Sequence, residues 1–235
     1  MFGLVSVAWN ALAAILFVLL PRKIGEPIGQ FVAMAGFRYI VAVMKACRVI
    51  ECDLSALDAL RDAGPMVIAP NHPSLLDVVL ITSRLPHVVC IAKPGIWSNI
   101  FLGGGARLAG YIRNDSPIRL VKQAAGQVRA GSHLLIFPEG TRTADGPVGD
   151  LRGGFALVAK VAGVPVQTVL IDSNSPFLRK GWPIFRKPDG PVTYRVRLGR
   201  RFEIGQDIRV LVGDLGRYYG RELAGEKRFP LGSAD

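Results

Sequence analysis

The sequence predicts an α/β domain with a mainly parallel sheet flanked by helices, preceded by an apolar helix or helix pair that associates with a membrane. From about residue 54, short apolar runs of strand length alternate with segments of helical periodicity, which is typical of a parallel sheet. Before that point, residues 1–20 contain no charged side chain. We therefore expect membrane-associating helices at residues 1–50 and a single globular domain at residues 51–235.

The first apolar segment, residues 1–20, has the length of a membrane span. A helix of ~20 residues at ~1.5 Å per residue crosses a hydrocarbon core of ~30 Å. Arg22 and Lys23 follow it, and basic residues keep their side of a span in the cytoplasm. No Lys or Arg precedes the run, which argues against a signal peptide. We expect the inner (cytoplasmic) membrane, with the domain on the cytoplasmic side; whether the segment spans or lies in the interface stays open.

A second apolar stretch covers residues 28–44 and is interrupted by Arg38. Together with Lys45 and Arg48, it is compatible with a helix that lies among lipid headgroups. An amphipathic helix that covers the globular core has the same pattern. The sequence does not choose between the two.

Within the domain, four apolar runs are expected to form buried strands, at residues 66–69, 88–92, 133–137 and 164–171. Residues 192–198 alternate between apolar and polar, which predicts a strand with one solvated face. The clearest helix runs from Pro117 to about Ala130, with Ser116 as its N-cap and Gly131 after its end. Another helix is expected at residues 208–223.

The net charge of +11 and the pI of about 10.1 favour anionic partners. The chain shows no recognised nucleic-acid-binding motif, so we expect no nucleic acid. Its three cysteines contain no CxxC pair, and its three histidines have no metal-ligand spacing. We therefore expect neither a disulfide framework nor a metal.

The first candidate motif, Asn71-His72-Pro73-Ser74-Leu75-Leu76-Asp77, follows a predicted strand. The carboxyl end of a strand is a usual place for catalysis in open α/β sheets, and an imidazole is a natural general base near neutrality. A carboxylate five residues later can accept the other ring N–H and fix the tautomer. The alternative is a capping box between Ser74 and Asp77, with His72 as an ordinary loop residue.

The second candidate motif, Phe137-Pro138-Glu139-Gly140-Thr141-Arg142, follows another predicted strand. Gly140 permits close backbone approach and can offer an N–H to an oxyanion. Arg142 can hold a phosphate in bidentate fashion, and Glu139 can hold a hydroxyl or orient the arginine. The alternative is a turn with a surface ion pair.

Together, in this order, the two motifs resemble the lysophospholipid acyltransferase family, of which 1-acylglycerol-3-phosphate acyltransferase is the best-known member. That family has NHxxxxD followed by FPEGTR, and both are present without a mismatch. The resemblance extends from about Pro65 to Ile171. It implies an O-acyltransferase that moves a fatty acyl chain from acyl-CoA or acyl carrier protein to a lysophospholipid, with no cofactor beyond the thioester co-substrate and with membrane lipid as its partner.

The resemblance also implies roles for individual residues. His72 corresponds to the catalytic base and Asp77 to its orienting partner. The residues that correspond to acceptor-binding positions are Lys93, Arg113, Glu139, Gly140, Thr141 and Arg142. Arg152 stands near a position where the family often has lysine, and Val164-Pro165-Val166 resembles the start of a further conserved block.

The sequence departs from the family pattern at two places. Gly103, Gly104 and Gly105 stand in a row, and Gln167-Thr168 replaces an expected second proline. Both departures leave the acceptor and the acyl-chain pocket open. Other acceptors are a glycolipid, an amino-acid lipid or a polyene lipid, and a non-enzymatic basic membrane-binding protein is a further alternative.

A last feature is the basic and aromatic stretch from Phe177 to Lys187. Aromatic residues beside cations suit a membrane interface. The same composition suits an acidic carrier protein or a solvated loop.

Overall fold

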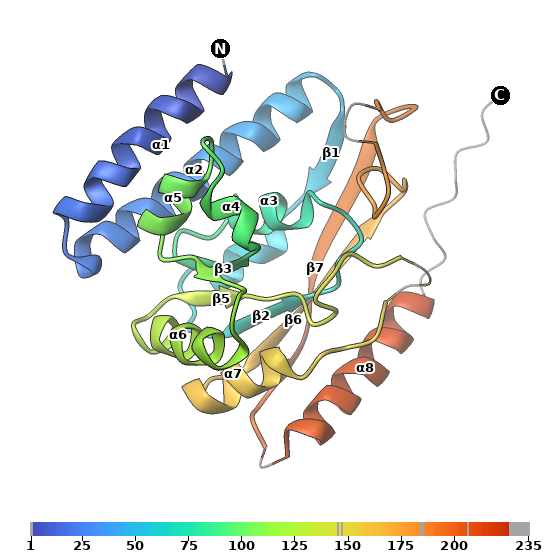
Figure 1. Cartoon of the computed structure of the whole chain (residues 1–235). Helices are drawn as coiled ribbons and strands as arrows, with labels where there is room; N and C mark the ends of the chain where they lie inside the picture. The colour runs from blue at the N-terminus through green and yellow to red at the C-terminus, as the bar shows by residue number, and fades with distance from the viewer. Residues whose placement is uncertain (1, 145, 147, 184–185, 206, 226–235) are drawn as a thin grey trace.

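The computed structural model describes residues 2–144, 146, 148–183, 186–205 and 207–225. Its centre is a seven-stranded sheet with the order β1-β7-β6-β2-β5-β3-β4, and helices cover both faces (Figure 1). Every pairing in the described sheet is parallel except that between β6 and β7. The predicted fold class, a mainly parallel sheet flanked by helices, is confirmed.

The strands match the predicted runs closely and add two short ones. They are β1 (Ile50–Asp53), β2 (Val67–Pro70), β3 (Val88–Ala92), β4 (Ile112–Arg113), β5 (His133–Leu135), β6 (Val166–Ser173) and β7 (Val192–Phe202). The sequence analysis did not identify β1 or β4, because four and two residues are too short for a clear apolar run.

Nine helical segments surround the sheet in the described residues: α1 (Phe2–Leu19), α2 (Arg22–Ala46), the 3-10 helix η1 (Ser55–Leu60), α3 (Asp77–Thr82), α4 (Pro94–Trp97), α5 (Gly103–Leu108), α6 (Pro117–Arg129), α7 (Gly154–Ala162) and α8 (Ile208–Gly225). Helix α6 begins at Pro117 as expected. Ser116 is its N-cap, as expected, and has the extended conformation of that position, although its side chain makes no capping hydrogen bond.

The side-chain alternation of β2 divides the core into two layers. Ile68 packs in a cluster with Val41 of α2, Leu57 of η1 and Leu80 of α3. Its neighbour Val67 points to the other face, into a cluster that α6, α7 and α8 complete. Both faces of the strand are thus buried, which is why it is apolar without interruption.

Gln167 and Thr168, which stand where the family pattern has a second proline, lie at an irregularity in the sheet. The pairing of β6 with β7 shifts register between Gln167 and Val169. The Gln167 amide donates to the carbonyl oxygen of Gly199 at 2.7 Å, and the Thr168 hydroxyl donates to that of Arg200 at 2.7 Å. These side chains therefore satisfy backbone groups that a shifted ladder leaves unpaired.

The N-terminal helices pack against the domain and expose an apolar surface elsewhere. Helix α2 is long and apolar enough to cross a membrane by length and composition, and α1 is apolar over its described part, Ser6–Leu19. Both carry exposed large hydrophobic side chains, among them Val18, Leu19 and Phe31. Yet Gln30 of α2 is buried and its amide donates to the Ser132 hydroxyl oxygen at 3.2 Å.

The three consecutive glycines form a close packing contact with α1. The side-chain oxygen of Asn10 accepts hydrogen bonds from the backbone N–H groups of Gly104 and Gly105. A Cβ at Gly104 would lie 2.2 Å from the Asn10 carbonyl oxygen, and one at Gly103 would lie 2.5 Å from that of Trp97. The absence of side chains is what lets α1 approach α5 at this position.

Candidate active site

The predicted site residues follow strands whose carboxyl ends meet at one edge of the sheet. Strands β2 and β5 are adjacent and parallel, with Ile68 opposite Leu135. The first motif leaves β2 and the second leaves β5. Strands β3 and β4 run in the same direction, with Ala92 opposite Arg113. The topology therefore brings all of the predicted site residues to the edge where ligands bind in open α/β sheets.

His72 and Asp77 form a hydrogen-bonded pair at this edge. The Nδ1 of His72 lies 2.8 Å from Oδ2 of Asp77. The histidine side chain is 14% exposed, whereas the carboxylate is fully buried. A carboxylate in this position makes Nδ1 the protonated nitrogen and leaves Nε2 as the basic atom, which is the arrangement that general-base catalysis requires.

The environment of Asp77 makes its carboxyl unusually weak as an acid. Burial raises the pKa of Asp77 to about 6, although the hydrogen bond from His72 and the charge of His72 act to lower it. Oδ2 accepts a second hydrogen bond from the backbone N–H of Ser74 at 2.8 Å. Oδ1 is buried without a partner among the described residues.

The capping alternative and the catalytic one are therefore compatible. Asp77 does reach back to the Ser74 N–H, as in a capping box, and the same oxygen faces His72. The Ser74 hydroxyl donates to the carbonyl oxygen of Phe177 at 3.1 Å, and its oxygen accepts the N–H of Leu76, just before α3 begins, at 3.2 Å.

The second motif holds the backbone of His72 in place. Glu139 is 4% exposed, and its carboxylate accepts hydrogen bonds from the His72 N–H at 2.9 Å, the Gly149 N–H at 2.8 Å and the Thr143 hydroxyl at 2.8 Å. The carbonyl oxygen of His72 in turn accepts from the Thr143 N–H at 2.8 Å. Because these contacts are all with protein, they favour a positioning role for Glu139 over direct contact with a substrate.

Phe137 completes the support of the imidazole. The two rings are stacked, with 3.7 Å between their centroids and an angle of 17°. His72 is thus fixed by a carboxylate at Nδ1, an aromatic face, and hydrogen bonds at its own N–H and C=O. Such restraint keeps a general base aligned before substrate arrives.

The remaining residues of the second motif lie on its exposed side. Gly140 has φ +69° and its N–H donates to the carbonyl oxygen of Phe137 at 3.0 Å, so this N–H closes a turn and is not free for an oxyanion, contrary to our expectation. Thr141 is exposed. Arg142 uses Nη1 to donate to the carbonyl oxygens of Leu178 and Arg179, at 3.0 and 3.1 Å.

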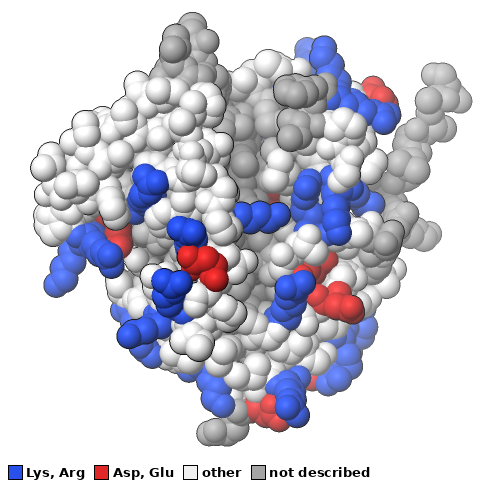
Figure 2. All heavy atoms as spheres, viewed as in Figure 1, with Lys and Arg blue, Asp and Glu red and all other residues white. Residues whose placement is uncertain are grey.

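Lys93 and Arg113 lie at the ends of β3 and β4, on the β5 side of His72. Both are exposed. Arg113 pairs with Asp115 at 3.0 Å, a contact open enough for an anionic ligand to compete with it. Figure 2 shows Lys and Arg atoms gathered around the middle of this face. The edge is therefore electropositive, as a site for phosphate-bearing substrates requires.

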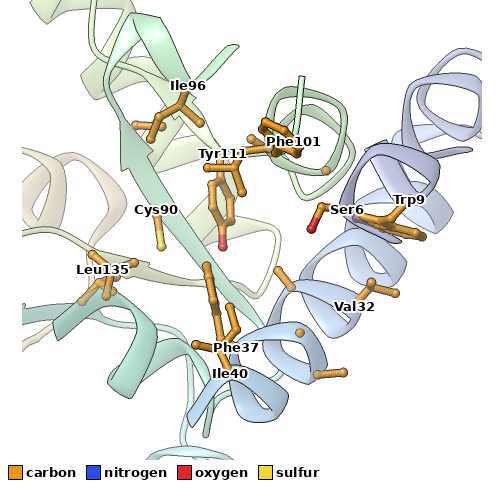
Figure 3. A pocket seen from close by; sticks show the side chains of 18 of the residues that line it. Ser6, Trp9, Val32, Phe37, Ile40, Cys90, Ile96, Phe101, Tyr111 and Leu135 are labelled. Carbon is orange, nitrogen blue, oxygen red and sulfur yellow. The ribbon is translucent and has the colours of Figure 1, made fainter. Parts of the chain in front are cut away.

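A large apolar cavity begins beside the histidine. Its volume is about 680 Å³, and Phe137, the ring stacked on His72, is part of its lining. The other walls come from α1, α2, α5 and the ends of β3 and β5, and the side chains of Trp9, Phe37 and Tyr111 face the space (Figure 3). Burial raises the pKa of the lining Cys90 thiol to about 11, which keeps it a neutral apolar group.

Sequence reasoning missed several residues that build the site. Thr143 and Gly149 hold Glu139, and Asn71 uses its amide to bond both the N–H and the C=O of Ile171, at 2.8 and 3.0 Å. Asn71 and Thr143 stand within or beside the motifs, so their polarity next to a buried strand was the available signal. Gly149 gave none.

The comparisons with known proteins agree with this geometry. The family model described as Acyltransferase matches residues 51–172, which include every predicted site residue. The chain is 29% identical over 137 residues to a chloroplast 1-acyl-sn-glycerol-3-phosphate acyltransferase of Brassica napus, covering 56% of this chain and 40% of that protein. It is 26% identical to the Pseudomonas aeruginosa enzyme of that name, over 83% of this chain and 74% of the relative.

Two further comparisons concern the acceptor and the fold. The chain is 32% identical over 126 residues to a lyso-ornithine lipid O-acyltransferase of Pseudomonas aeruginosa, covering 48% of each protein. The crystal structure of the 1-acyl-sn-glycerophosphate acyltransferase PlsC of Thermotoga maritima superposes with a TM-score of 0.67 at 17% identity, over 95% of both chains. At that identity the likeness concerns the fold. The chain spans only two-fifths of the length of the Brassica relative.

Proposed function

The chain belongs to the acyltransferase family, and we propose that it is an O-acyltransferase that moves a fatty acyl chain from a thioester to the hydroxyl of a lysophospholipid such as 1-acylglycerol-3-phosphate, giving phosphatidic acid. The observation that carries the proposal is the His72–Asp77 pair, 2.8 Å apart, whose imidazole stacks on Phe137, a residue that lines an apolar cavity. The names of the relatives support a phosphate-bearing acceptor.

The chemistry follows from the orientation of the imidazole. With Nδ1 held by Asp77, Nε2 of His72 takes the proton of the acceptor hydroxyl while the hydroxyl oxygen attacks the thioester carbonyl carbon. The tetrahedral intermediate collapses, the C–S bond breaks, and the imidazolium returns the proton to the departing thiolate. The ester and a free thiol are the products, and no acyl-enzyme is formed. Asp77 stabilises the imidazolium between the two steps.

The oxyanion of the intermediate requires donors other than the Gly140 N–H. The backbone N–H groups of Thr141 and Arg142 make no hydrogen bond with any residue that the structure describes. They follow the turn that Gly140 closes, on the exposed side of the second motif. We assign the oxyanion to these amides, because backbone donors that are already fixed need no reorganisation during reaction.

The apolar cavity is the proposed site of an acyl chain, because its lining is almost wholly apolar and it opens beside the base. Since α1 and α2 form one wall, their exposed apolar side chains would seat the cavity in a bilayer, where lipid substrates reside. The contact of Asn10 with α5 favours an interfacial position of α1 over an isolated span. Arg22 and Lys23 favour the cytoplasmic leaflet.

A second acceptor is supported by a specific observation. The lyso-ornithine lipid O-acyltransferase relative is more similar per residue than the Brassica protein, at 32% identity. An amino-acid lipid offers the same hydroxyl nucleophile without the phosphate. The donor, acyl-CoA or acyl carrier protein, is a separate choice, and the basic surface accepts either.

The test is one assay with defined substrates. Purified protein in phospholipid vesicles is supplied with lysophosphatidic acid or lyso-ornithine lipid, and with an acyl-CoA or acyl carrier protein thioester. We expect phosphatidic acid to form, and the His72→Ala variant to lower kcat by about 10²–10⁴-fold. The proposal is wrong if no pair of substrates reacts, or if a folded His72→Ala protein keeps the wild-type rate.

A further inference from the structure

The segment that joins β6 to β7 is bonded to both catalytic motifs, although it belongs to neither. The carbonyl oxygen of Leu178 accepts the Leu75 N–H at 3.1 Å and Nη1 of Arg142 at 3.0 Å. The carbonyl oxygen of Phe177 accepts the Ser74 hydroxyl at 3.1 Å. We name residues 174–183 the β6 segment. Because this segment is hydrogen-bonded to both the first and the second motif, its position relative to His72 is fixed.

The conformation of the β6 segment is held against a local preference. Leu178 is 9% exposed and has φ +58°, a left-handed conformation that a branched side chain rarely adopts. Phe177 packs edge-on against Trp182, with 5.7 Å between ring centroids. Such a conformation persists where the surroundings impose it, and it frequently occurs beside functional sites.

The β6 segment presents a cation, Arg179, that pairs with none of the described residues. Arg179 is half-buried, and its side chain makes no ion pair or hydrogen bond with any described residue. Its backbone is fixed, because its carbonyl oxygen accepts from Arg142 at 3.1 Å and from the Trp182 N–H at 3.0 Å. A partly desolvated guanidinium without a counter-ion is costly unless a ligand provides one.

Arg179 lies near Tyr194, whose hydroxyl contacts the first motif. Burial raises the pKa of the Tyr194 hydroxyl to about 12, and the charge of Arg179 is among the influences that oppose this rise. That hydroxyl lies 3.1 Å from the hydroxyl of Ser74, whose own N–H binds the Asp77 carboxylate. Arg179 is thus next to a side chain that contacts the first motif directly.

The order of the strands places Arg179 on one side of the base and the exposed cations Lys93 and Arg113 on the other. In the sheet, β2 lies between β6 and β5. The β6 segment follows β6, whereas Lys93 and Arg113 lie at the ends of β3 and β4, beyond β5. The apolar cavity lies on the β5 and β3 side as well. Two phosphate-bearing substrates that meet at one base can therefore use cations on either side of it.

We propose that Arg179 binds a phosphate group of a substrate, on the side of His72 opposite Lys93 and Arg113, and that Arg142 positions it by holding the β6 segment. The inference rests on the proposed acyl transfer. The phosphate is either that of the lysophospholipid acceptor or one carried by the thioester donor, since both molecules contain the same chemical group. A guanidinium suits either, because it can pair two of its donors with two phosphate oxygens.

The test compares Arg179→Ala with the wild type and with Lys187→Ala, which removes an equal charge from an exposed side chain of the same connection. Substrate dependence is measured separately for lysophosphatidic acid and for acyl-CoA. We expect Arg179→Ala to raise one KM by about tenfold to a hundredfold, Arg179→Lys to raise it less, and Lys187→Ala to leave both KM values unchanged. A raised acceptor KM assigns the phosphate to the acceptor, and a raised donor KM assigns it to the donor.

Two results would overturn the assignment while leaving the proposed function intact. One is an active Arg179→Ala protein with both KM values at the wild-type level. The other is an equal KM increase in Lys187→Ala, which would reveal a general effect of surface charge. The melting temperature of each variant distinguishes loss of binding from loss of folding. A wild-type protein that transfers no acyl chain would refute the proposed function itself.

Discussion

The proposed catalytic edge and the N-terminal wall of the cavity are built by opposite means. At the edge, His72, Asp77 and Glu139 meet through charged and polar hydrogen bonds of 2.8 to 2.9 Å. In the wall, α1 and α2 line the cavity mainly with apolar side chains. Helix α1 contacts α5 through a hydrogen bond from the Gly104 backbone N–H to the Asn10 side chain. The edge comes from two short motifs, whereas the lining of the whole cavity is drawn from residues between Ser6 and Phe137.

This contrast shows which parts of a site a sequence can reveal. A buried polar group must find specific partners, because an unsatisfied donor or acceptor costs roughly 1–3 kcal/mol. Residue types at such positions are therefore restricted and form recognisable motifs. An apolar cavity tolerates many side chains of similar volume. Substitutions of the polar residues at the edge should therefore affect the rate of acyl transfer, and substitutions in the cavity wall should affect which acyl chain is accepted.

The largest effect is expected from Asp77→Asn. The amide keeps the shape but cannot fix the imidazole in the tautomer with a basic Nε2, so kcat should fall by about 10²–10⁴-fold with little change in either KM. Steady-state kinetics on vesicles measure it. A rate within a few-fold of the wild type would show that the carboxylate is only a helix cap.

Asp77→Asn should lower the rate but raise the stability of the folded protein at neutral pH. Burial raises the pKa of Asp77 to about 6, above its usual value of 3.8, so the folded chain binds this proton more tightly than the unfolded chain. Its contribution to the free energy of unfolding therefore decreases as the pH rises from about 4 to about 6, and is constant above that. Urea unfolding across this range should show that decrease in the wild type and its absence in Asp77→Asn.

Wild-type activity should fall as the pH drops through about 6, when the carboxylate of Asp77 is protonated.

A smaller effect is expected from Glu139→Gln. An amide cannot accept all of the hydrogen bonds from His72, Thr143 and Gly149, and its NH₂ group would face donors, so the free energy of unfolding should decrease by about 2–3 kcal/mol. Loss of activity should follow from a displaced His72. Glu203→Gln, at a side chain that is 77% exposed, is the control and should change stability little. If Glu139→Gln were as stable as the wild type but bound the acceptor weakly, Glu139 would be a substrate ligand.

Much of the fold was predictable because buried strands are apolar on both faces. Residues 88–92 and the helix from Pro117 match the structure almost residue for residue. Strand β4 was missed because two residues carry no periodicity. Helix α7 (Gly154–Ala162) was missed because its N-cap is Gly153, which has no capping side chain, although Gly163 ends the helix in the left-handed conformation. The glycine row at 103–105 is a departure from the family pattern that the sequence does not explain, since only the packed α1 shows why side chains are excluded there.

At the site, the residue types were predictable but their partners were not. His72 and Asp77 are five residues apart, so a turn brings them together locally. The contact between Glu139 and His72 spans 67 residues and depends on β2 and β5 being neighbours, which the sequence does not specify. Arg142 illustrates the limit: its type suggested phosphate binding, yet its guanidinium holds the backbone of Leu178 and Arg179.

The smallest effect on rate, and the sharpest test of the contrast, is expected from Gly104→Ala. Its new methyl group would lie 2.2 Å from the Asn10 carbonyl oxygen, so α1 must move as a body, at a cost of about 1–2 kcal/mol in stability. Because α1 forms part of the cavity wall, the preference among acyl chains of different length should shift, while the pH dependence set by Asp77 should not. Gly126→Ala in α6, where no atom lies within 4 Å of the new methyl, should instead stabilise the protein by about 0.5–1 kcal/mol without altering chain preference. An unchanged chain-length profile in a destabilised Gly104→Ala protein would separate α1 from the acyl-chain site and remove the distinction between wall and edge.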